Sequence, residues 1–189
     1  MQPTIKNRRE FLKEISVYAG STAFLASIPW MKVFAQENGK NQAASDRLRL
    51  GIIGVGSRGH GLLLNLLEIE NVEVVAVCDD YEPNYQNAIK TTGGKAKSFY
   101  DHRKMIDEVK MDGVIIATPL HQHAHITIDC LNAGIHVFCE KSMARTLEDS
   151  KQMVDTAKTT GKILQIGQQR LFNPVYLNAL ERVRAGKPD

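Results

Sequence analysis

The sequence has few cysteines, no CxxC spacing and no run of like charge. Cys78, Cys130 and Cys139 cannot all pair, and no Cys/His spacing suggests a structural metal site. We therefore expect all three to be small apolar core residues and no metal to be bound. The net charge of +3 comes without a Lys/Arg run, which argues against a nucleic-acid partner.

The composition places the chain among ordinary globular proteins. Hydrophobic residues make up 43% and charged residues 24% of its 189 positions. That length is enough for one domain of usual size and part of another. The sequence shows no internal repeat of fixed period and no low-complexity tract.

The amino-terminal segment has the features of an export signal. Residues 7–13 read Asn-Arg-Arg-Glu-Phe-Leu-Lys and resemble a twin-arginine signal. A weakly apolar stretch (15–28) follows, too short and polar for stable membrane insertion. We predict a signal peptide at 1–35, a linker at 36–47 and a periplasmic protein. The alternative is an amino-terminal helix that belongs to the fold, with the protein then cytoplasmic.

Strand-type and helix-type patterns alternate along the rest of the chain. We expect strands at 48–53, 72–78, 96–100, 113–117, 135–139 and 162–166. We expect helices at 59–69, 83–91, 102–109, 123–133, 146–160 and 174–185. This order predicts the α/β class, with a doubly wound parallel sheet (Rossmann) that carries helices on both faces.

The expected domain organisation follows from this alternation. A Rossmann dinucleotide-binding domain is predicted at 48–171, and the start of a second α/β domain at 172–189. Because the last helix resembles the entry into a further domain, we expect the chain to be a fragment or a truncated product.

The first strand leads into a glycine-rich turn. Residues 50–59 read Leu-Gly-Ile-Ile-Gly-Val-Gly-Ser-Arg-Gly, and Asp79 stands twenty residues after the last glycine. In such a fingerprint Gly54 permits the tight turn, Gly56 lets a pyrophosphate approach the backbone, and Gly59 allows close helix packing. The motif predicts a dinucleotide site, and the alternative is a glycine-rich turn in some other α/β protein.

The helix that follows the turn supplies the remaining contacts. Its amino terminus at Ser57 and Arg58 offers backbone N–H groups to phosphates. Asp79 is placed to accept hydrogen bonds from the ribose hydroxyls, and with Asp80 it would repel a 2′-phosphate. The cofactor is therefore predicted to be NAD rather than NADP. Arg58 favours the opposite choice, because a guanidinium there could pair with that phosphate.

Three loops after later strands are expected at the same edge of the sheet. They contain Thr118 and Pro119, then Glu140-Lys141-Ser142, then Gln168 to Arg170. Ligands bind at the carboxyl ends of the strands in such sheets, so these loops should line one crevice with the glycine turn.

The motifs together resemble a known family. The Gly-Val-Gly-Ser-Arg-Gly turn, the Thr-Pro-x-x-x-His loop (118–123) and the His-Val-Phe-Cys-Glu-Lys run (136–141) are similar to those of the Gfo/Idh/MocA oxidoreductases. The resemblance covers roughly 48–176. It implies an enzyme that uses NAD or NADP on sugars, inositols or their derivatives, with a second domain that holds most substrate contacts. Full-length relatives are then expected to form homo-oligomers.

The resemblance also implies roles for individual residues. Lys141 would assist proton transfer and contact the cofactor, and Glu140 would position the cofactor ribose. A partly desolvated lysine beside a cofactor cation can accept a proton. Ser142 replaces the family's usual proline, which loosens the constraint on Lys141. Without the resemblance, the favoured interpretation of Glu140 and Lys141 would be a surface ion pair at the end of a strand.

The remaining implied positions lie on the neighbouring loops. Thr118, Pro119, His123 and Gln168 would contact the cofactor, and Arg170 would approach the substrate. His121, His123 and His125 alternate as some metal ligands do, but no carboxylate or cysteine completes a set.

We therefore predict an NAD-dependent oxidoreductase that acts on a sugar or polyol by hydride transfer. One alternative is an NAD-dependent glycosidase that oxidises its substrate transiently. Another is a truncated, non-catalytic dinucleotide-binding module.

Overall fold

The computed structural model describes residues 47–169 and 173–186. Its strands are β1 (Leu48–Ile53), β2 (Val72–Cys78), β3 (Lys97–Phe99), β4 (Gly113–Ile116), β5 (His136–Glu140) and β6 (Leu164–Gly167). Its helices are α4 (Ser57–Leu67), α5 (Glu82–Thr91), α6 (His102–Glu108), the 3₁₀ turn η1 (Leu120–Gln122), α7 (His123–Asn132), α8 (Leu147–Thr160) and α9 (Pro174–Arg184).

The described residues belong to two compact units. Arg47–Gly167 form the first, and α9 belongs to the second. The predicted signal peptide, nearly all of the predicted linker, and Arg170 lie outside the described residues. Among the helices of the described ranges, none has the length and apolar character needed to cross a membrane.

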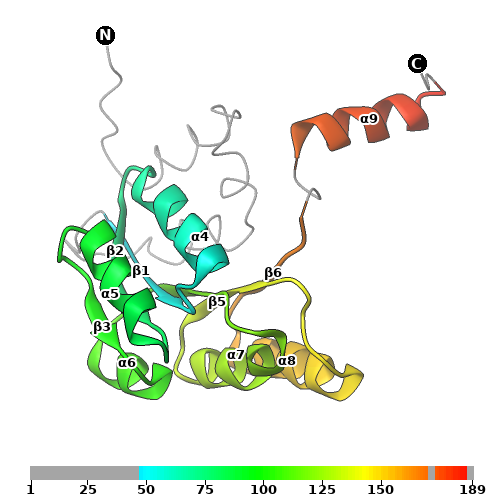
Figure 1. Ribbon diagram of the computed structural model, residues 1–189. Coiled ribbons are helices and arrows are strands. Elements are labelled where there is room, and N and C mark those ends of the chain that lie inside the picture. The colour runs from blue at the N-terminus through cyan, green and yellow to red at the C-terminus, as the bar shows by residue number, and fades with distance from the viewer. Residues whose placement is uncertain (1–46, 170–172, 187–189) are drawn as a thin grey trace, which may run out of the picture. The chain divides into compact units, whose positions relative to one another are not determined.

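The six strands form one parallel sheet in the order β3-β2-β1-β4-β5-β6. Figure 1 shows α4 and α5 on one side of this sheet, and α6, α7 and α8 on the other. This arrangement confirms the predicted doubly wound parallel sheet. The chain reverses its winding direction between β1 and β4, which makes their carboxyl ends the switch point of the fold.

Helices on both faces explain why the central strands are apolar throughout. All four residues of β4 and all five of β5 are buried. A parallel strand covered on both faces has no solvent side, so its sequence does not alternate. Each large side chain that is fully buried, such as Ile52 or Phe138, contributes about 1.5–3 kcal/mol to stability.

Two predicted boundaries differ from the structure where the site is built. The first helix begins at Ser57 rather than at 59, because the chain turns into the helix directly after Gly56. The fifth strand extends to Glu140, because Glu140 pairs with Gly167 of β6. Glu140 is therefore a strand residue with a fixed backbone and not the first residue of a loop.

The three cysteines are free and buried, which confirms their predicted place in the core. Desolvation raises the pKa of Cys78 and of Cys139 to about 12, and it also raises the pKa of Cys130. The thiolate is the reactive form, so all three thiols should be inert in the native protein.

We expect no reaction of the native protein with a thiol reagent such as DTNB at pH 8. In denaturant, burial is lost, and three thiols per chain should react. Absorbance of the released product measures the count. A thiol that titrates rapidly in the native state would show that its side chain is not buried.

Candidate functional site

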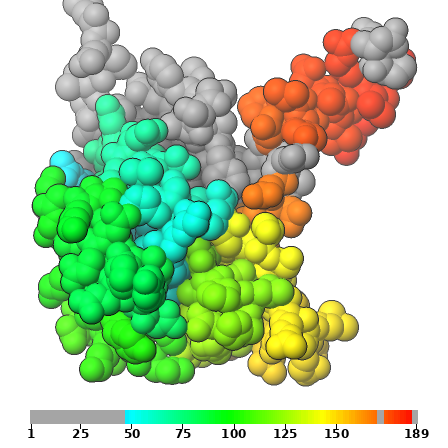
Figure 2. Space-filling model, viewed as in Figure 1, coloured from blue at the N-terminus to red at the C-terminus, as the bar shows by residue number. Residues whose placement is uncertain are grey.

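A cavity of about 380 Å³ opens at the carboxyl ends of β1, β2 and β4. Its wall is formed by the glycine turn before α4, by the residues after β2, and by parts of α6, η1 and α7. Figure 2 shows the surface in this region, where the cyan start of α4 meets the green β2–α5 segment and the yellow-green α7. The cavity therefore lies at the switch point of the sheet, where ligands bind in such folds.

The three glycines of the turn are needed for different reasons. At Gly54, φ is +82° and an added Cβ would lie 2.7 Å from the Thr118 nitrogen. At Gly59, an added Cβ would overlap the Gly54 carbonyl oxygen. At Gly56, it would meet only the Asn84 Nδ2 atom, at 3.5 Å. Gly54 and Gly59 are thus required by packing, whereas the absent side chain of Gly56 leaves space on the cavity side.

The amino terminus of α4 is open to an anion. No side chain caps this helix, and its first turn contains no acidic residue. Ser57 and Arg58, its first two residues, both line the cavity. Because the first N–H groups of a helix lack intrahelical partners and carry partial positive charge, they bind phosphate groups well.

Asp79 ties three parts of the site together. Its Oδ2 accepts a hydrogen bond from the Val55 backbone N–H at 2.7 Å. Its Oδ1 accepts from the Tyr81 backbone N–H at 3.0 Å and from Asn84 Nδ2 at 3.1 Å. The carboxylate lines the cavity but is only 9% exposed. Asp79 therefore fixes the glycine turn against the start of α5, which the sequence motif did not indicate.

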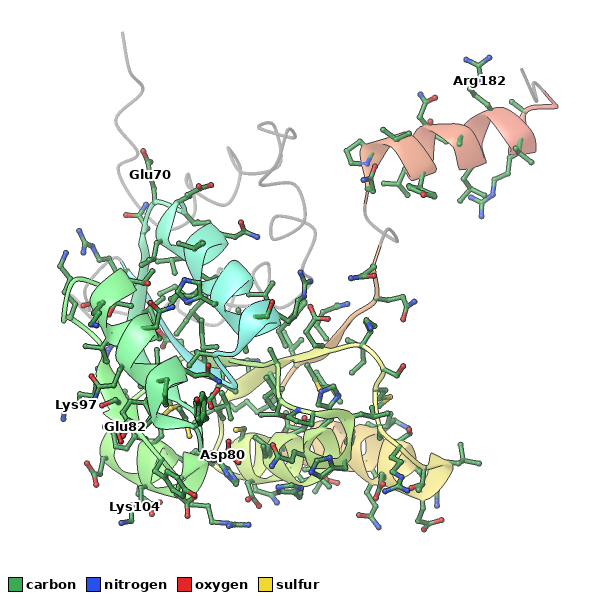
Figure 3. All side chains as sticks on the ribbon, in the orientation of Figure 1. Glu70, Asp80, Glu82, Lys97, Lys104 and Arg182 are labelled. Atoms are coloured by element: carbon green, nitrogen blue, oxygen red, sulfur yellow. The ribbon has the colours of Figure 1, made fainter. Side chains whose placement is uncertain are left out.

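Asp80 supplies the exposed negative charge at the same rim. It lines the cavity beside Asp79 and is exposed to solvent. In the view of Figure 3, the labelled Asp80 lies between α6 and α7, which contribute His102 and His125 to the cavity wall. Two carboxylates at one rim disfavour an additional phosphate group there.

Arg58 forms an ion pair across the mouth of the site. Its Nη2 lies 2.6 Å from Glu140 Oε1, and its Nε donates to the same oxygen at 3.0 Å. The Glu140 side chain is 5% exposed, and that of Arg58 is 49% exposed. In this structure the guanidinium is engaged by Glu140, so it is not held free for the 2′-phosphate that would favour NADP.

Glu140 also contacts the residue that follows it. The Lys141 backbone N–H donates to Glu140 Oε2 at 3.3 Å. At Gly167 on the neighbouring strand, an added Cβ would lie 3.4 Å from Glu140 Oε1 and 2.6 Å from Phe138 Cζ. The absence of a side chain at Gly167 therefore leaves space for the Glu140 carboxylate.

Lys141 is the first residue after β5, and its side chain is exposed. The peptide bond between Lys141 and Ser142 is cis. Neither Lys141 nor Glu140 lines the cavity itself. The Arg58–Glu140 ion pair links the cavity wall to the residue before Lys141.

The resemblance predicts His123 as a cofactor contact, but the structure buries this residue. Its side chain belongs to the first residue of α7 and is 1% exposed. Nδ1 lies 2.8 Å from the Ser142 carbonyl oxygen, and Nε2 lies 2.9 Å from the Thr118 carbonyl oxygen. His123 therefore joins two loops behind the cavity wall instead of lining the cavity.

The structure brings most of the predicted cofactor residues to one wall. Those that line the cavity are Gly54, Gly56, Ser57, Arg58, Asp79, Thr118 and Pro119. Gly59 lies behind the turn, and Gln168 is an exposed residue that follows β6. The specific ligand contacts of all these residues stay predictions.

Sequence reasoning missed the far wall of the cavity. Tyr100, His102, Gln122 and His125 line it, and they come from two separate stretches of the chain, 100–102 and 122–125. Tyr100 could have been found, because it follows a strand at the carboxyl edge. His102 had no motif to indicate it, and His125 was considered only as one of three alternating histidines, since only folding brings α6 beside α7.

The two histidines of this wall lie close to each other, and His102 also contacts a carboxylate. His102 Nε2 lies 2.8 Å from Asp129 Oδ2, and the His102 and His125 ring centroids are 5.9 Å apart. Burial, followed by the nearby His102, lowers the pKa of His125. His125 thus presents a neutral ring to the cavity at pH 7. In the part of the chain that the structure describes, no group of three or more His, Cys, Asp or Glu side chains could hold a metal ion.

The fold and the cavity together define a class of protein. A doubly wound parallel sheet with a glycine turn, an open helix amino terminus and an acidic rim at its switch point is the architecture of dinucleotide-binding domains. The family model of the Gfo/Idh/MocA proteins, an oxidoreductase family with an NAD-binding Rossmann fold, matches residues 48–168. The chain belongs to this family, which confirms the resemblance seen in the sequence, and residues 48–168 form its NAD-binding Rossmann fold.

Relatives of this chain include proteins named for two kinds of reaction. Inositol 2-dehydrogenase of Salmonella typhimurium is 33% identical over 75% of this chain and 44% of its own length. A glycosyl hydrolase family 109 protein of Stenotrophomonas maltophilia is 29% identical over 95% of this chain and 39% of its own.

A solved structure extends the likeness to the fold. The scyllo-inositol dehydrogenase of Lactobacillus casei, with bound NAD(H) and scyllo-inositol, matches with a TM-score of 0.70 and 26% identity. The match covers 75% of this chain and 42% of that enzyme. The chain thus spans less than half the length of the relatives it matches.

Proposed function

We propose that this chain is the NAD-binding part of an enzyme that transfers a hydride between NAD and a sugar or polyol. The observation that carries the proposal is the open position at Gly56. There, an added Cβ would meet only Asn84 Nδ2, at an ordinary contact distance of 3.5 Å, and would fill cavity space beside an uncapped helix amino terminus. The inositol dehydrogenases among its relatives support a polyol as the substrate class.

The residues of this chain would divide the work as follows. The backbone N–H groups at Ser57 and Arg58 would hold the pyrophosphate. Asp79 and Asp80 form the acidic rim that disfavours a 2′-phosphate, so NAD is preferred over NADP. When bound, the nicotinamide ring supplies the hydride acceptor or donor. Lys141 would take the proton that the substrate hydroxyl loses in the oxidation.

We expect Gly56→Ala to weaken NAD binding without unfolding the protein. A methyl group there would occupy ligand space, and at φ −64° alanine is not strained. The dissociation constant should rise about 30-fold, which is equivalent to about 2 kcal/mol. Isothermal titration calorimetry measures this constant, and NADP should bind the parent chain more weakly than NAD.

Gly61→Ala, within the same helix, is the matched control. No atom lies within 4 Å of a Cβ added at Gly61, so NAD affinity should not change. Equal affinity of the parent chain and the Gly56→Ala variant would refute the placement of the pyrophosphate. No NAD binding by the parent chain would refute the proposed function.

A second function is supported by the glycosyl hydrolase family 109 relative, which aligns with 95% of this chain. In a glycosidase that oxidises its substrate transiently, oxidation to a ketone would acidify a neighbouring C–H group, and the glycosidic bond would then be eliminated. Water would add to the resulting double bond, and return of the hydride to the ketone carbon would regenerate NAD. Such an enzyme would release sugar without net formation of NADH. Parallel measurement of NADH absorbance and of product release from a polyol and from a nitrophenyl glycoside would separate the two functions.

Export and assembly are further parts of the proposal. The twin-arginine-like motif and the small residues at 33 and 35 support cleavage after residue 35 and a periplasmic location. Amino-terminal sequencing of the protein from a periplasmic fraction tests the cleavage. The family resemblance supports a homo-oligomer for the full-length enzyme, which light scattering would detect. Recovery of the protein only in the cytoplasmic fraction, with residue 1 still present, would refute export.

A further inference from the structure

The short segment that carries Lys141 is held on both of its sides. Before the lysine, the Glu140 carboxylate pairs with Arg58 of the glycine turn. After the lysine, the Ser142 carbonyl oxygen faces the His123 ring. Lys141 has an exposed side chain but a backbone that is fixed at both neighbours.

The two restraints differ in their exposure to water. Arg58 is half exposed, so water and salt screen its pair with Glu140. The His123 ring is 1% exposed, and its contacts are not screened in this way. The contact after the lysine is therefore the stiffer of the two.

The His123 ring lies between two hydrogen-bond acceptors. Both ring nitrogens face backbone carbonyl oxygens, at 2.8 Å and 2.9 Å. A carbonyl oxygen only accepts hydrogen bonds, so a nitrogen without a proton would place two lone pairs against each other. A ring nitrogen that carries a proton therefore finds an acceptor on either side of the ring, whichever tautomer is present.

The two carbonyl groups that contact the His123 ring belong to different loops. Thr118 belongs to the loop after β4 and lines the cavity, whereas Ser142 follows Lys141 in the loop after β5. One buried side chain therefore joins the cavity wall to the loop of the lysine. The two loops cannot shift relative to each other without breaking one of the two contacts.

We propose that His123 is a positioning residue that fixes Lys141 relative to the NAD cavity by holding the Ser142 and Thr118 carbonyl groups at its two ring nitrogens. The inference rests on the proposed function, because it assigns the lysine a place beside the bound cofactor. His123 touches neither cofactor nor substrate, and it acts through the Ser142 and Thr118 carbonyl groups.

The first experiment reads the protons directly. Long-range ¹H–¹⁵N spectra of the labelled chain at pH 7, assigned by comparison with a His123 variant, should show a His123 ring N–H hydrogen that exchanges slowly with water, because both ring nitrogens are buried against carbonyl oxygens. A ring hydrogen that exchanges rapidly with water would overturn the buried link between the two loops. This measurement needs neither cofactor nor turnover.

The second experiment separates the two contacts. His123→Asn places an amide nitrogen near the position of Nδ1 and can keep the contact with Ser142. His123→Gln places one near Nε2 and can keep only the contact with Thr118. We expect the Gln variant to lower kcat about 100-fold, as a displacement of about 1 Å does, and the Asn variant to retain most of kcat.

The two His123 variants are also compared by a measurement that does not depend on activity. NAD should protect Lys141 of the parent chain and of the Asn variant from an amine reagent, as measured by mass spectrometry. In the Gln variant this protection should be lost although NAD still binds. Equal loss in both variants, or equal retention, would overturn the positioning role. If the parent chain does not bind NAD, the proposed function fails, while the ring spectra still decide whether His123 joins the two loops.

Discussion

Replacing Lys141 with alanine is expected to lower kcat by about 10²–10⁴ and to leave the affinity for NAD nearly unchanged. A positioned acid or base contributes about that much to proton transfer. The cavity that would hold NAD is built from other residues, and Lys141 is not part of its wall. Steady-state assays with NAD and inositol, together with calorimetric titration of NAD, measure the two quantities separately.

Lys151→Ala is the control for this prediction. Lys151 is an exposed residue of α8 and belongs to no part of the site, so kcat and affinity should both stay as they are. A Lys141→Ala variant with undiminished turnover would remove the lysine from the mechanism. A variant with weakened NAD binding and unaltered kcat would make Lys141 a cofactor ligand and not a proton acceptor.

Replacing Gly59 with alanine is expected to destabilise the whole domain. The added Cβ would overlap the Gly54 carbonyl oxygen, which is backbone and cannot rotate away. The start of α4 must then move from β1, at a cost of about 3 kcal/mol in the free energy of unfolding. Urea denaturation followed by circular dichroism measures the loss, and NAD binding should fall with it.

The matched variant on the same helix is Gly61→Ala, which should act in the opposite direction. A Cβ there meets no atom within 4 Å, and alanine favours a helix over glycine by about 1 kcal/mol. Both variants add one methyl group to α4, at positions two residues apart. Equal unfolding free energies for the two variants would show that α4 does not approach the turn as closely as the structure has it.

Much of the fold could be predicted because its signals are local. Strand and helix follow each other within short stretches, and β4 is apolar at every position because both faces are covered. The glycine turn and Asp79 lie within one β–α–β unit, so their spacing along the chain already determines their proximity. The chosen boundaries erred by one or two residues where pairing with a neighbour extended a strand, as at Glu140.

The parts of the site that escaped prediction depend on residues far apart in the chain. Arg58 and Glu140 are separated by 82 positions, and the pair forms because β5 ends beside the glycine turn. The resemblance assigned Glu140 to the ribose and His123 to the cofactor. It could not show that Glu140 pairs with Arg58, or that the His123 ring contacts two backbone carbonyl groups.

The amino-acid sequence alone determined the order of strands and helices, the family, the cofactor class and the turn that receives it. All of these depend on residue types at short, fixed spacings. Tertiary structure decided which buried polar groups meet: the Asp79 carboxylate with the Val55 N–H, Arg58 with Glu140, and the His123 ring with two loop carbonyl groups. The physical reason is that a buried donor or acceptor must find a partner wherever folding brings one within reach, and distance along the chain does not encode that choice.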